Sequence, residues 1–477
     1  MELETVKKLI NHYLAKHEVF VTAAKEAEKY YENEDSILNT GAAAVDAINQ
    51  YLKQCGQNPL HSADNRIPLN WHRILVDQKI GYLFTYPPQF DTDDSSNIDF
   101  QSLLGDDYEK IIKKLGVDAS NTGRAWIQYW QGVDGRLEYY YVDPKQVLPI
   151  YDETNIKKPL KMVIRYYTAL DEQGEEYVRY ELWDEKEVCF YYHKSKENID
   201  KLIPEMINLT KAKVVKHGFD TIPFIKFSNN SLEVSDLKMC KQVIDCLDKA
   251  WSGFANDIDD IQEVIWVLKN YTADIGTPFK LDEHGEPLVD ERGLPIKNEY
   301  TPDLLQMLKA KKVAEVGGDG GIETVTSEIP YEARQAFLDG LVRQLFISAM
   351  AVDPRPENTG NSSGVYIDFL YGLLELKAGL METEFRGSLN RLVRAVSSAS
   401  NDIKITQTWT RNKPRNDLEI AQIINGTSPD VMSNQTKTKV HPLVDDWVDE
   451  RKQIDKEAED VYPEKPLFKD DVDGEEK

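Results

Sequence analysis

The side chains best suited to contacting a ligand lie in one short segment that is rich in amides, hydroxyls and glycine. In order, it contains Asn358, Thr359, Gly360, Asn361, Ser362, Ser363 and Gly364. These groups make hydrogen bonds but carry neither charge nor bulk, and glycine gives the backbone conformations that other residues avoid. The segment therefore suits weak hydrogen bonding to a partner that must not be held tightly.

Residue patterns typical of enzymes and metal sites are incomplete in this chain. Residues 91–102 alternate oxygen ligands as a calcium loop does, but Ser96 replaces the glycine of the turn and Ser102 the bidentate glutamate. The glycine-rich residues 317–321 lack the Lys-Ser/Thr pair and the helix of a P-loop. The eight histidines show no metal-ligand spacing. We therefore expect no catalytic residues, no metal and no cofactor.

Two helices must hold the polar segment. Pro354 and Pro356 stop the first helix, because proline lacks an amide donor and clashes with the preceding turn. Beyond the segment, apolar residues recur at spacings of three and four, which predicts a long amphipathic helix over residues 365–400. Its apolar positions are Tyr366, Leu370, Leu373, Leu374, Leu380, Phe385, Leu389, Leu392, Val393 and Val396.

A second apolar repeat predicts a helix over residues 237–268, roughly 50 Å long at 1.5 Å per residue. The repeat is typical of a helix that packs lengthwise on another helix. Acidic residues lie off this apolar face: Asp245, Asp248, Asp257, Asp259, Asp260 and Glu263. A solvated surface is the simplest interpretation of the acidic face.

Residues 125–230 change character, and strands dominate. Four aromatic and β-branched runs separated by turn residues predict an antiparallel meander. The runs are residues 137–142, 162–167, 177–182 and 188–192. Farther along, residues 312–316 and 322–326 flank the glycine-rich turn and predict a hairpin. Together with the helices, these runs predict an α+β fold.

The composition limits the possible partners. A chain of 477 residues is too long to fold around a single hydrophobic core. Its net charge of −25 leaves too few cationic side chains for tight general binding of nucleic acid. Two interpretations of the acidity stay open: a solubilising surface, or a channel whose like-charged walls let DNA slide. No apolar run reaches membrane-spanning length. The four cysteines include no Cys-x-x-Cys pair, which is typical of a reducing cytosol.

Several short motifs, in order over residues 25 to 400, resemble those of portal proteins of tailed bacteriophages, of the siphophage type from Gram-positive hosts. Ser363-Gly364-Val365 and residues 372–378 resemble the tunnel loop and the long helix after it. Tyr30-Tyr31 with Ser36-Ile37-Leu38 resembles the N-terminal motif of the family, and residues 65–83 resemble its next helix. Residues 221–227 resemble the strand ahead of its stem. One departure is Phe84-Thr85-Tyr86-Pro87-Pro88, where the family usually has Gly-Lys-Pro.

The resemblance implies an organisation for the whole chain. It implies a wing-like α+β region (1–230), a stem helix (231–270), a clip-like insertion with a hairpin (271–330), a second stem helix (331–350), a tunnel loop (351–364), a long channel-side helix (365–400), and a crown-like region with an acidic tail (401–477). The same resemblance places residues 358–364 in a DNA channel, and turns Asp257, Asp259, Asp260 and Glu263 toward it.

The resemblance also implies the function. Such proteins form a homo-oligomeric ring, commonly a dodecamer, at one capsid vertex of the virion, after assembly in the bacterial cytoplasm. Double-stranded DNA passes through the ring during packaging and ejection. The implied partners are the terminase large subunit, which supplies ATP hydrolysis, the major capsid and scaffolding proteins, and a head–tail adaptor. No membrane is implied, and the portal itself catalyses nothing.

Two alternatives stay open. A structural or adaptor protein without a channel could use the apolar face of residues 237–268 to form a small coiled-coil oligomer. That protein would have no need for the small polar segment between two long helices. A metal-dependent nuclease is the weaker alternative, because Asp184-Glu185-Lys186 lacks a matching upstream acid on a strand.

Overall fold

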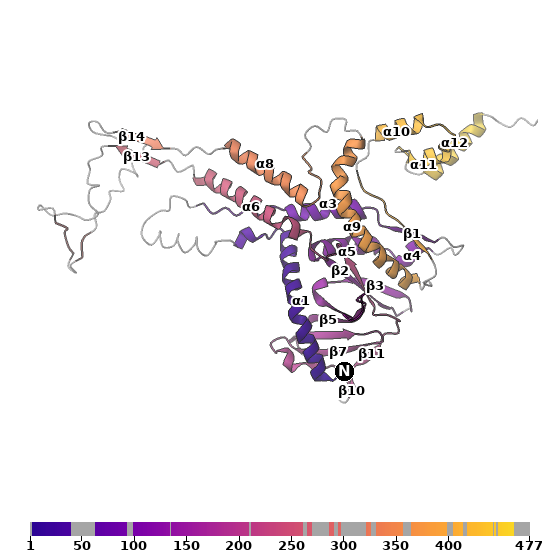
Figure 1. Cartoon of the computed structure of the whole chain (residues 1–477), viewed down its shortest axis with the longest axis horizontal. Coiled ribbons are helices and arrows are strands. Elements are labelled where there is room, and N and C mark those ends of the chain that lie inside the picture. Colours follow the sequence, from indigo (N-terminus) through magenta and orange to yellow (C-terminus); the bar gives the residue numbers. More distant parts are fainter. Residues whose placement is uncertain are drawn as a thin grey trace, which may run out of the picture. The chain divides into compact units, whose positions relative to one another are not determined.

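The structure is a computed structural model of the whole chain. It describes residues 2–461 except 40–62, 93–98, 134, 209–210, 261–264, 270–285, 291–293, 297–320, 326–330, 356–363, 398–403, 414–416, 442 and 445–446. The chain divides into two units. Unit 1 comprises residues 1–35, 69–245 and 341–477, and unit 2 comprises residues 36–68 and 246–340 (Figure 1).

The largest sheet of unit 1 is antiparallel and six-stranded. Its order is β11-β7-β6-β5-β4, and β8 also pairs with β7. The strands are β4 (Val147–Tyr151), β5 (Leu160–Leu170), β6 (Glu176–Trp183), β7 (Glu187–Lys194), β8 (Ile203–Pro204) and β11 (Val214–Lys216). Helix α1 (Leu3–Tyr31) lies along this sheet, where Val6 and Ile10 are buried in one cluster with Ile164.

A second, three-stranded sheet carries the larger core of unit 1. Its order is β12-β2-β3, and helices α3, α5 and α9 pack in the same core. These elements are β2 (Arg124–Gln131), β3 (Leu137–Val142), β12 (Phe224–Ser228), α3 (Trp71–Phe84), α5 (Tyr108–Thr122) and α9 (Gly364–Ser397). The ring of Phe385 on α9 lies 5.6 Å from Phe84 and 5.1 Å from Phe227, centroid to centroid. The sheet and α9 are therefore held by one aromatic cluster.

The remaining elements of unit 1 are short. A two-stranded sheet joins β1 (Gln89–Thr92) to β15 (Ile405–Thr408), and another joins β9 (Met206–Asn208) to β10 (Lys211–Ala212). The other helices are α4 (Phe100–Leu104), η2 (Pro144–Gln146), η3 (Ile199–Lys201), α10 (Asp417–Gly426), α11 (Asn434–Val440) and α12 (Trp447–Val461). None of the described helices is both long and apolar enough to span a bilayer.

The predicted α+β class and all four predicted strands are confirmed. The predicted meander is correct for β5, β6 and β7, whose antiparallel pairings follow chain order. It is wrong for β3, which pairs with β2 in the smaller sheet. The reason is that β2 and β3 form a hairpin, and the η2 turn beginning at Pro144 then separates β3 from β4.

Unit 2 contains the far half of α6 (Leu237–Asp260), the first half of α8 (Tyr331–Ser348), the short η1 (Ser36–Asn39), and the pair β13 (Ile265–Lys269) and β14 (Gly321–Val325). The predicted helix through residue 268 is wrong at its end, because α6 stops at Asp260 and residues 265–269 form β13. Ile265, Trp266 and Val267 are β-branched or aromatic and favour an extended strand.

The predicted hairpin of residues 312–316 and 322–326 is only partly described. Residues 321–325 form β14, which pairs with β13, with Ile265 opposite Val325. Residues 312–316 lie outside the described part of the chain. The pairing found here joins segments that are more than fifty residues apart, so local turn chemistry could not reveal it.

Candidate functional site

Of the predicted DNA-contacting segment, residues 358–364, the structure describes only Gly364 and the residues on either side. Residues 358–363 lie outside the described residues, and Gly364 is the first residue of α9. On the other side, the chain is described from the end of α8 to Arg355. Both flanks belong to unit 1. The site can therefore be built from the contacts that fix these two flanks.

Helix α8 ends in a tight cap just before the segment. The Met350 backbone is left-handed, with φ 52°. The Ala351 N–H donates to the Phe346 carbonyl at 2.9 Å, and the Met350 N–H donates to the Ile347 carbonyl at 3.1 Å. These two bonds form a Schellman motif, which satisfies carbonyls at the helix end. The chain direction after α8 is therefore set by a defined turn.

Gln78 of α3 then holds the chain beyond that cap. Its side-chain Nε2 donates to the Val352 carbonyl at 2.8 Å, and its Oε1 accepts from the Val352 N–H at 3.0 Å. One amide thus pairs both backbone groups of one residue, as a neighbouring strand would. Val352 is itself buried in the larger core. The flank before the polar segment is consequently fixed to α3.

A buried charge cluster connects the same flank to α9. Lys377 of α9 donates from Nζ to the Ala349 carbonyl at 2.9 Å and lies 3.2 Å from Asp236 Oδ2. Lys79 of α3 lies 2.6 Å from the same oxygen. Asn229 accepts from Lys79 at 2.8 Å and donates to Asp236 Oδ1 at 2.9 Å. Asp236 therefore joins α3, α9 and the end of α8 through two lysines.

The cluster is almost fully removed from solvent. The side chains of Lys79 and Asp236 are 1% and 7% exposed, and that of Lys377 is 13% exposed. Burial lowers the pKa of Lys79 to about 8, although Asp236 opposes that shift. Burial disfavours the Asp236 carboxylate, but the charges of Lys377 and Lys79 prevail and lower its pKa well below the usual range. The carboxylate is thus ionised between two ammonium groups.

A glycine lets the Asp236 segment reach this position. Gly123 follows α5 with φ +89°, and a Cβ there would lie 2.1 Å from the Glu233 carbonyl oxygen. Next to this close contact between Gly123 and Glu233, the Asp236 N–H donates to the Ser120 carbonyl at 2.8 Å. Only glycine satisfies both the backbone angle and the close contact. The C-terminal end of α5 therefore positions the central carboxylate of the cluster.

His72 gives this region a pH dependence that can be measured. Its Nε2 lies 2.9 Å from Asn121 Oδ1. Burial lowers the pKa of His72 to about 4; Asp236 and the Asn121 hydrogen bond oppose this shift, and Lys377 and Lys79 add to it. In the unfolded chain, the pKa of a histidine side chain is about 6.5.

The unfolded state binds more protons than the folded state between pH 6.5 and 4, so stability should fall as the pH drops through that window. The loss attributable to His72 is about 3 kcal/mol at most. We expect the free energy of unfolding of the His72→Gln variant, measured by urea unfolding, to fall less between pH 6.5 and 4 than that of wild type. His12 is exposed, so the His12→Gln variant should show the wild-type decrease. Equal pH profiles for wild type and His72→Gln would contradict the prediction.

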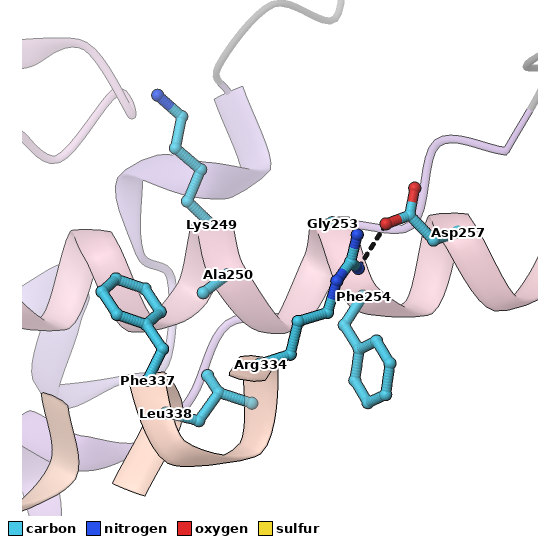
Figure 2. A pocket seen from close by; sticks show the side chains of 8 residues that line it. All are labelled: Lys249, Ala250, Gly253, Phe254, Asp257, Arg334, Phe337 and Leu338. Carbon is cyan, nitrogen blue, oxygen red and sulfur yellow. Dashed lines mark ion pairs between the residues drawn. The ribbon is translucent and has the colours of Figure 1, made fainter. Parts of the chain in front are cut away.

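The predicted channel-facing acids are partly described, all of them in unit 2. Asp257 forms an ion pair with Arg334 of α8 (Figure 2). Asp259 accepts a hydrogen bond from Asn65 Nδ2 at 2.6 Å. Glu263 and the side chain of Asp260 lie outside the described residues. The structure thus gives two of these acids partners within the subunit, and their channel-facing role stays a prediction.

The sequence-based prediction missed the residues that hold the flanks, although a signal existed. Lys79 follows Leu75 by four positions and precedes Leu83 by four, so it occupies the apolar face of its helix. Lys377 similarly follows Leu374 by three positions. A lysine on an apolar face points to a buried partner, because charged side chains are almost never fully buried unless paired. The identity of the partner could not be read from spacing.

The cluster can bear a mechanical role, because it links α3, α9 and the end of α8. Among the described residues, no group of three or more His, Cys, Asp or Glu side chains could hold a metal ion. The arrangement fixes the backbone before the polar segment at Ala349 and ties it to α9, the helix that follows the segment.

The comparisons with known proteins agree with one another. A family model described as phage portal protein, SPP1 Gp6-like, matches residues 10–464. The portal protein of Clostridium phage phiCD119 is 34% identical over 487 aligned positions, which cover 97% of this chain and 96% of that protein. The portal protein of Bacillus phage SPP1 is 28% identical over 452 positions, which cover 90% of this chain and 82% of the relative.

Two solved structures of particle necks also resemble the chain. The neck of a native GTA particle, computed with C12 symmetry, has a TM-score of 0.39 at 12% identity and covers 83% of this chain and 93% of that chain. The neck of an empty GTA particle, computed with C6 symmetry, has a TM-score of 0.41 at 11% identity and covers 79% and 90%.

Proposed function

This chain belongs to the SPP1 Gp6-like family of phage portal proteins, and on that premise we propose that it forms a ring at one capsid vertex through which double-stranded DNA is packaged and later ejected. The match to the family over residues 10–464 carries this proposal. Two portal proteins that are similar over most of their own length support it. These relatives favour the portal over the adaptor without a channel.

The segment 358–364 is proposed to contact the DNA backbone. Its amides and hydroxyls can donate to phosphate oxygens without adding positive charge. Contacts of this kind break as easily as they form, which suits a duplex that moves past them. The support from the structure is that Gln78 holds Val352, six residues before the segment, and that Lys377 ties α9, the helix that begins at Gly364, to the end of α8. Fixed flanks keep such a segment in one place on the subunit.

The remaining parts of the proposal concern assembly and partners. The ring is proposed to be a dodecamer that assembles in the cytoplasm of the bacterial host. The terminase large subunit, the major capsid and scaffolding proteins, and a head–tail adaptor are proposed to dock on it. No catalytic step is assigned to this chain, because ATP hydrolysis belongs to the terminase. The net charge of −25 supports passage of DNA without tight general binding.

The contact between the segment and DNA is tested by adding bulk. Gly360→Trp together with Asn361→Trp should leave rings intact but lower DNase-protected DNA per particle several-fold, because indole rings would narrow the passage. Ile156→Trp is the control, since Ile156 is fully exposed (100%) and lies far along the chain from the segment. If rings with the double substitution package as much DNA as wild type, the segment does not contact the duplex.

A further inference from the structure

A groove lies between α6 and α8 in unit 2 (Figure 2). It has a volume of about 290 Å³. Its lining is Lys249, Ala250, Gly253, Phe254, Asp257, Arg334, Phe337 and Leu338. Apolar groups form most of this surface, and Arg334 lies along one side, paired with Asp257 and 5.6 Å from the centre of the Phe254 ring.

The groove owes its depth to a missing side chain. Gly253 lies on α6 between Ala250 and Phe254, and a Cβ built on it would meet no atom within 4 Å. Glycine in the middle of a helix costs roughly 0.5–1 kcal/mol relative to alanine. The φ of Gly253 does not require glycine, because it is not in the left-handed region. The open space is therefore the physical feature that glycine provides here.

Helix α6 presents two other faces in this unit. The polar side chains of one face make hydrogen bonds within the subunit. Ser252 Oγ accepts from the Ile67 N–H at 3.0 Å, and Asn256 Oδ1 accepts from the Asn65 N–H at 2.6 Å. The other carries exposed apolar side chains, Trp251 (39% exposed) and Ile258 (45% exposed). These two residues are seven positions apart and share one face, about 100° around the helix from the groove.

We propose that Trp251 and Ile258 of one subunit dock into the α6–α8 groove of the next subunit. The inference rests on the proposed ring, and it names the surfaces that would build it. A closed ring of more than two copies uses a heterologous interface, in which two different surfaces of the same chain meet. The projecting face and the groove are two such surfaces, and they lie on one rigid helix.

The chemistry of the two surfaces matches. At roughly 30 Å³ per water molecule, the groove of about 290 Å³ has the volume of about ten waters, so it has room for an indole ring. Tryptophan is enriched among the residues that dominate interface energies. The chain carries a net charge of −25, so copies repel one another at long range, and an apolar contact is the kind that can offset this repulsion.

The separation of the two surfaces also explains growth beyond a dimer. A first contact uses the groove of one copy and the tryptophan of another. It leaves one groove and one tryptophan unused, so the next copy adds in the same way. If both partners had used the same patch, the contact would be isologous and would close as a dimer.

Filling the groove is the direct test. Gly253→Leu places a side chain in open space and favours the helix, so the subunit should remain folded. We expect it to need at least about tenfold more protein for half-maximal ring formation than wild type. Gly253→Ala is the matched control, because it adds only one methyl group and should form rings as wild type does. Circular dichroism and light scattering report folding and mass.

A mixing experiment distinguishes docking from general damage. Trp251→Glu removes the projecting group and keeps the groove, whereas Gly253→Leu removes the groove and keeps the tryptophan. Each variant alone should stay monomeric at a concentration where wild type forms rings. An equimolar mixture should form a species of two subunits and stop there, because only one complementary pair of surfaces remains.

Three outcomes decide the inference. The inference is supported if each variant is monomeric by itself and the mixture of the two forms a two-subunit species. Rings of wild-type mass from both variants overturn it and leave the ring itself intact. If wild-type protein forms no ring, with or without scaffolding protein, the proposed portal function fails and this interface fails with it.

Discussion

Asp236→Asn is expected to lower the free energy of unfolding of unit 1 by about 3–5 kcal/mol, because it removes the counter-ion of two buried ammonium groups. Lys79 lies 2.6 Å and Lys377 3.2 Å from the lost carboxylate oxygen. Asparagine keeps the size of the side chain, so the effect isolates charge. Urea unfolding monitored by circular dichroism measures the loss.

The control for that experiment is an exposed ion pair. Glu109→Gln removes the carboxylate that pairs with Lys113 on the surface of α5, and it should cost less than about 1 kcal/mol. The triple variant Lys79→Met, Asp236→Asn and Lys377→Met should recover part of the stability, because no unpaired charge remains buried. A cost for Asp236→Asn no greater than that for Glu109→Gln would contradict the assigned role of the cluster.

Gln78→Met is expected to have a comparably large effect, because both backbone groups of buried Val352 lose their partner. An unsatisfied buried polar group costs about 1–3 kcal/mol, so the two together should cost roughly 2–6 kcal/mol. Gln78→Glu keeps an acceptor for the Val352 N–H but loses the donor to its carbonyl. We expect its loss of stability to be intermediate.

The same variants test whether the anchor matters for DNA passage. With the flank released, rings that still assemble should contain less DNase-protected DNA per particle than wild type. Gln101→Met is the control, since Gln101 is an exposed glutamine on α4. Unchanged DNA content in rings carrying Gln78→Met would show that the anchor supports the fold alone.

Local patterns predicted well those elements whose residue spacing is strongly periodic. The aromatic run at residues 137–142 matches β3 at both ends, and the apolar repeat from Tyr366 predicts α9 closely. Such patterns succeed because each element buries one face, and the spacing of apolar residues records that face. They did not assign β3 to its sheet, because β2, its hairpin partner just before it in the sequence, was not among the predicted strands.

The other errors concern contacts between residues that are far apart in the sequence. The three-and-four spacing continues through Ile265 and Leu268, yet the chain forms a strand there, because β14 supplies hydrogen bonds from residues 321–325. The buried cluster joins positions 79, 236 and 377, which no local pattern connects. The polar segment could be proposed from its composition and from the resemblance to portal proteins. Its contact with DNA remains a prediction, and the described structure contributes the anchors on either side.

The mass and shape of the purified protein test the central claim most directly. Light scattering and negative-stain electron microscopy should show a ring of about a dozen subunits with a central hole, as expected for a portal with cyclic symmetry. A small oligomer without a hole, at high concentration and also in the presence of scaffolding and capsid proteins, would contradict the account.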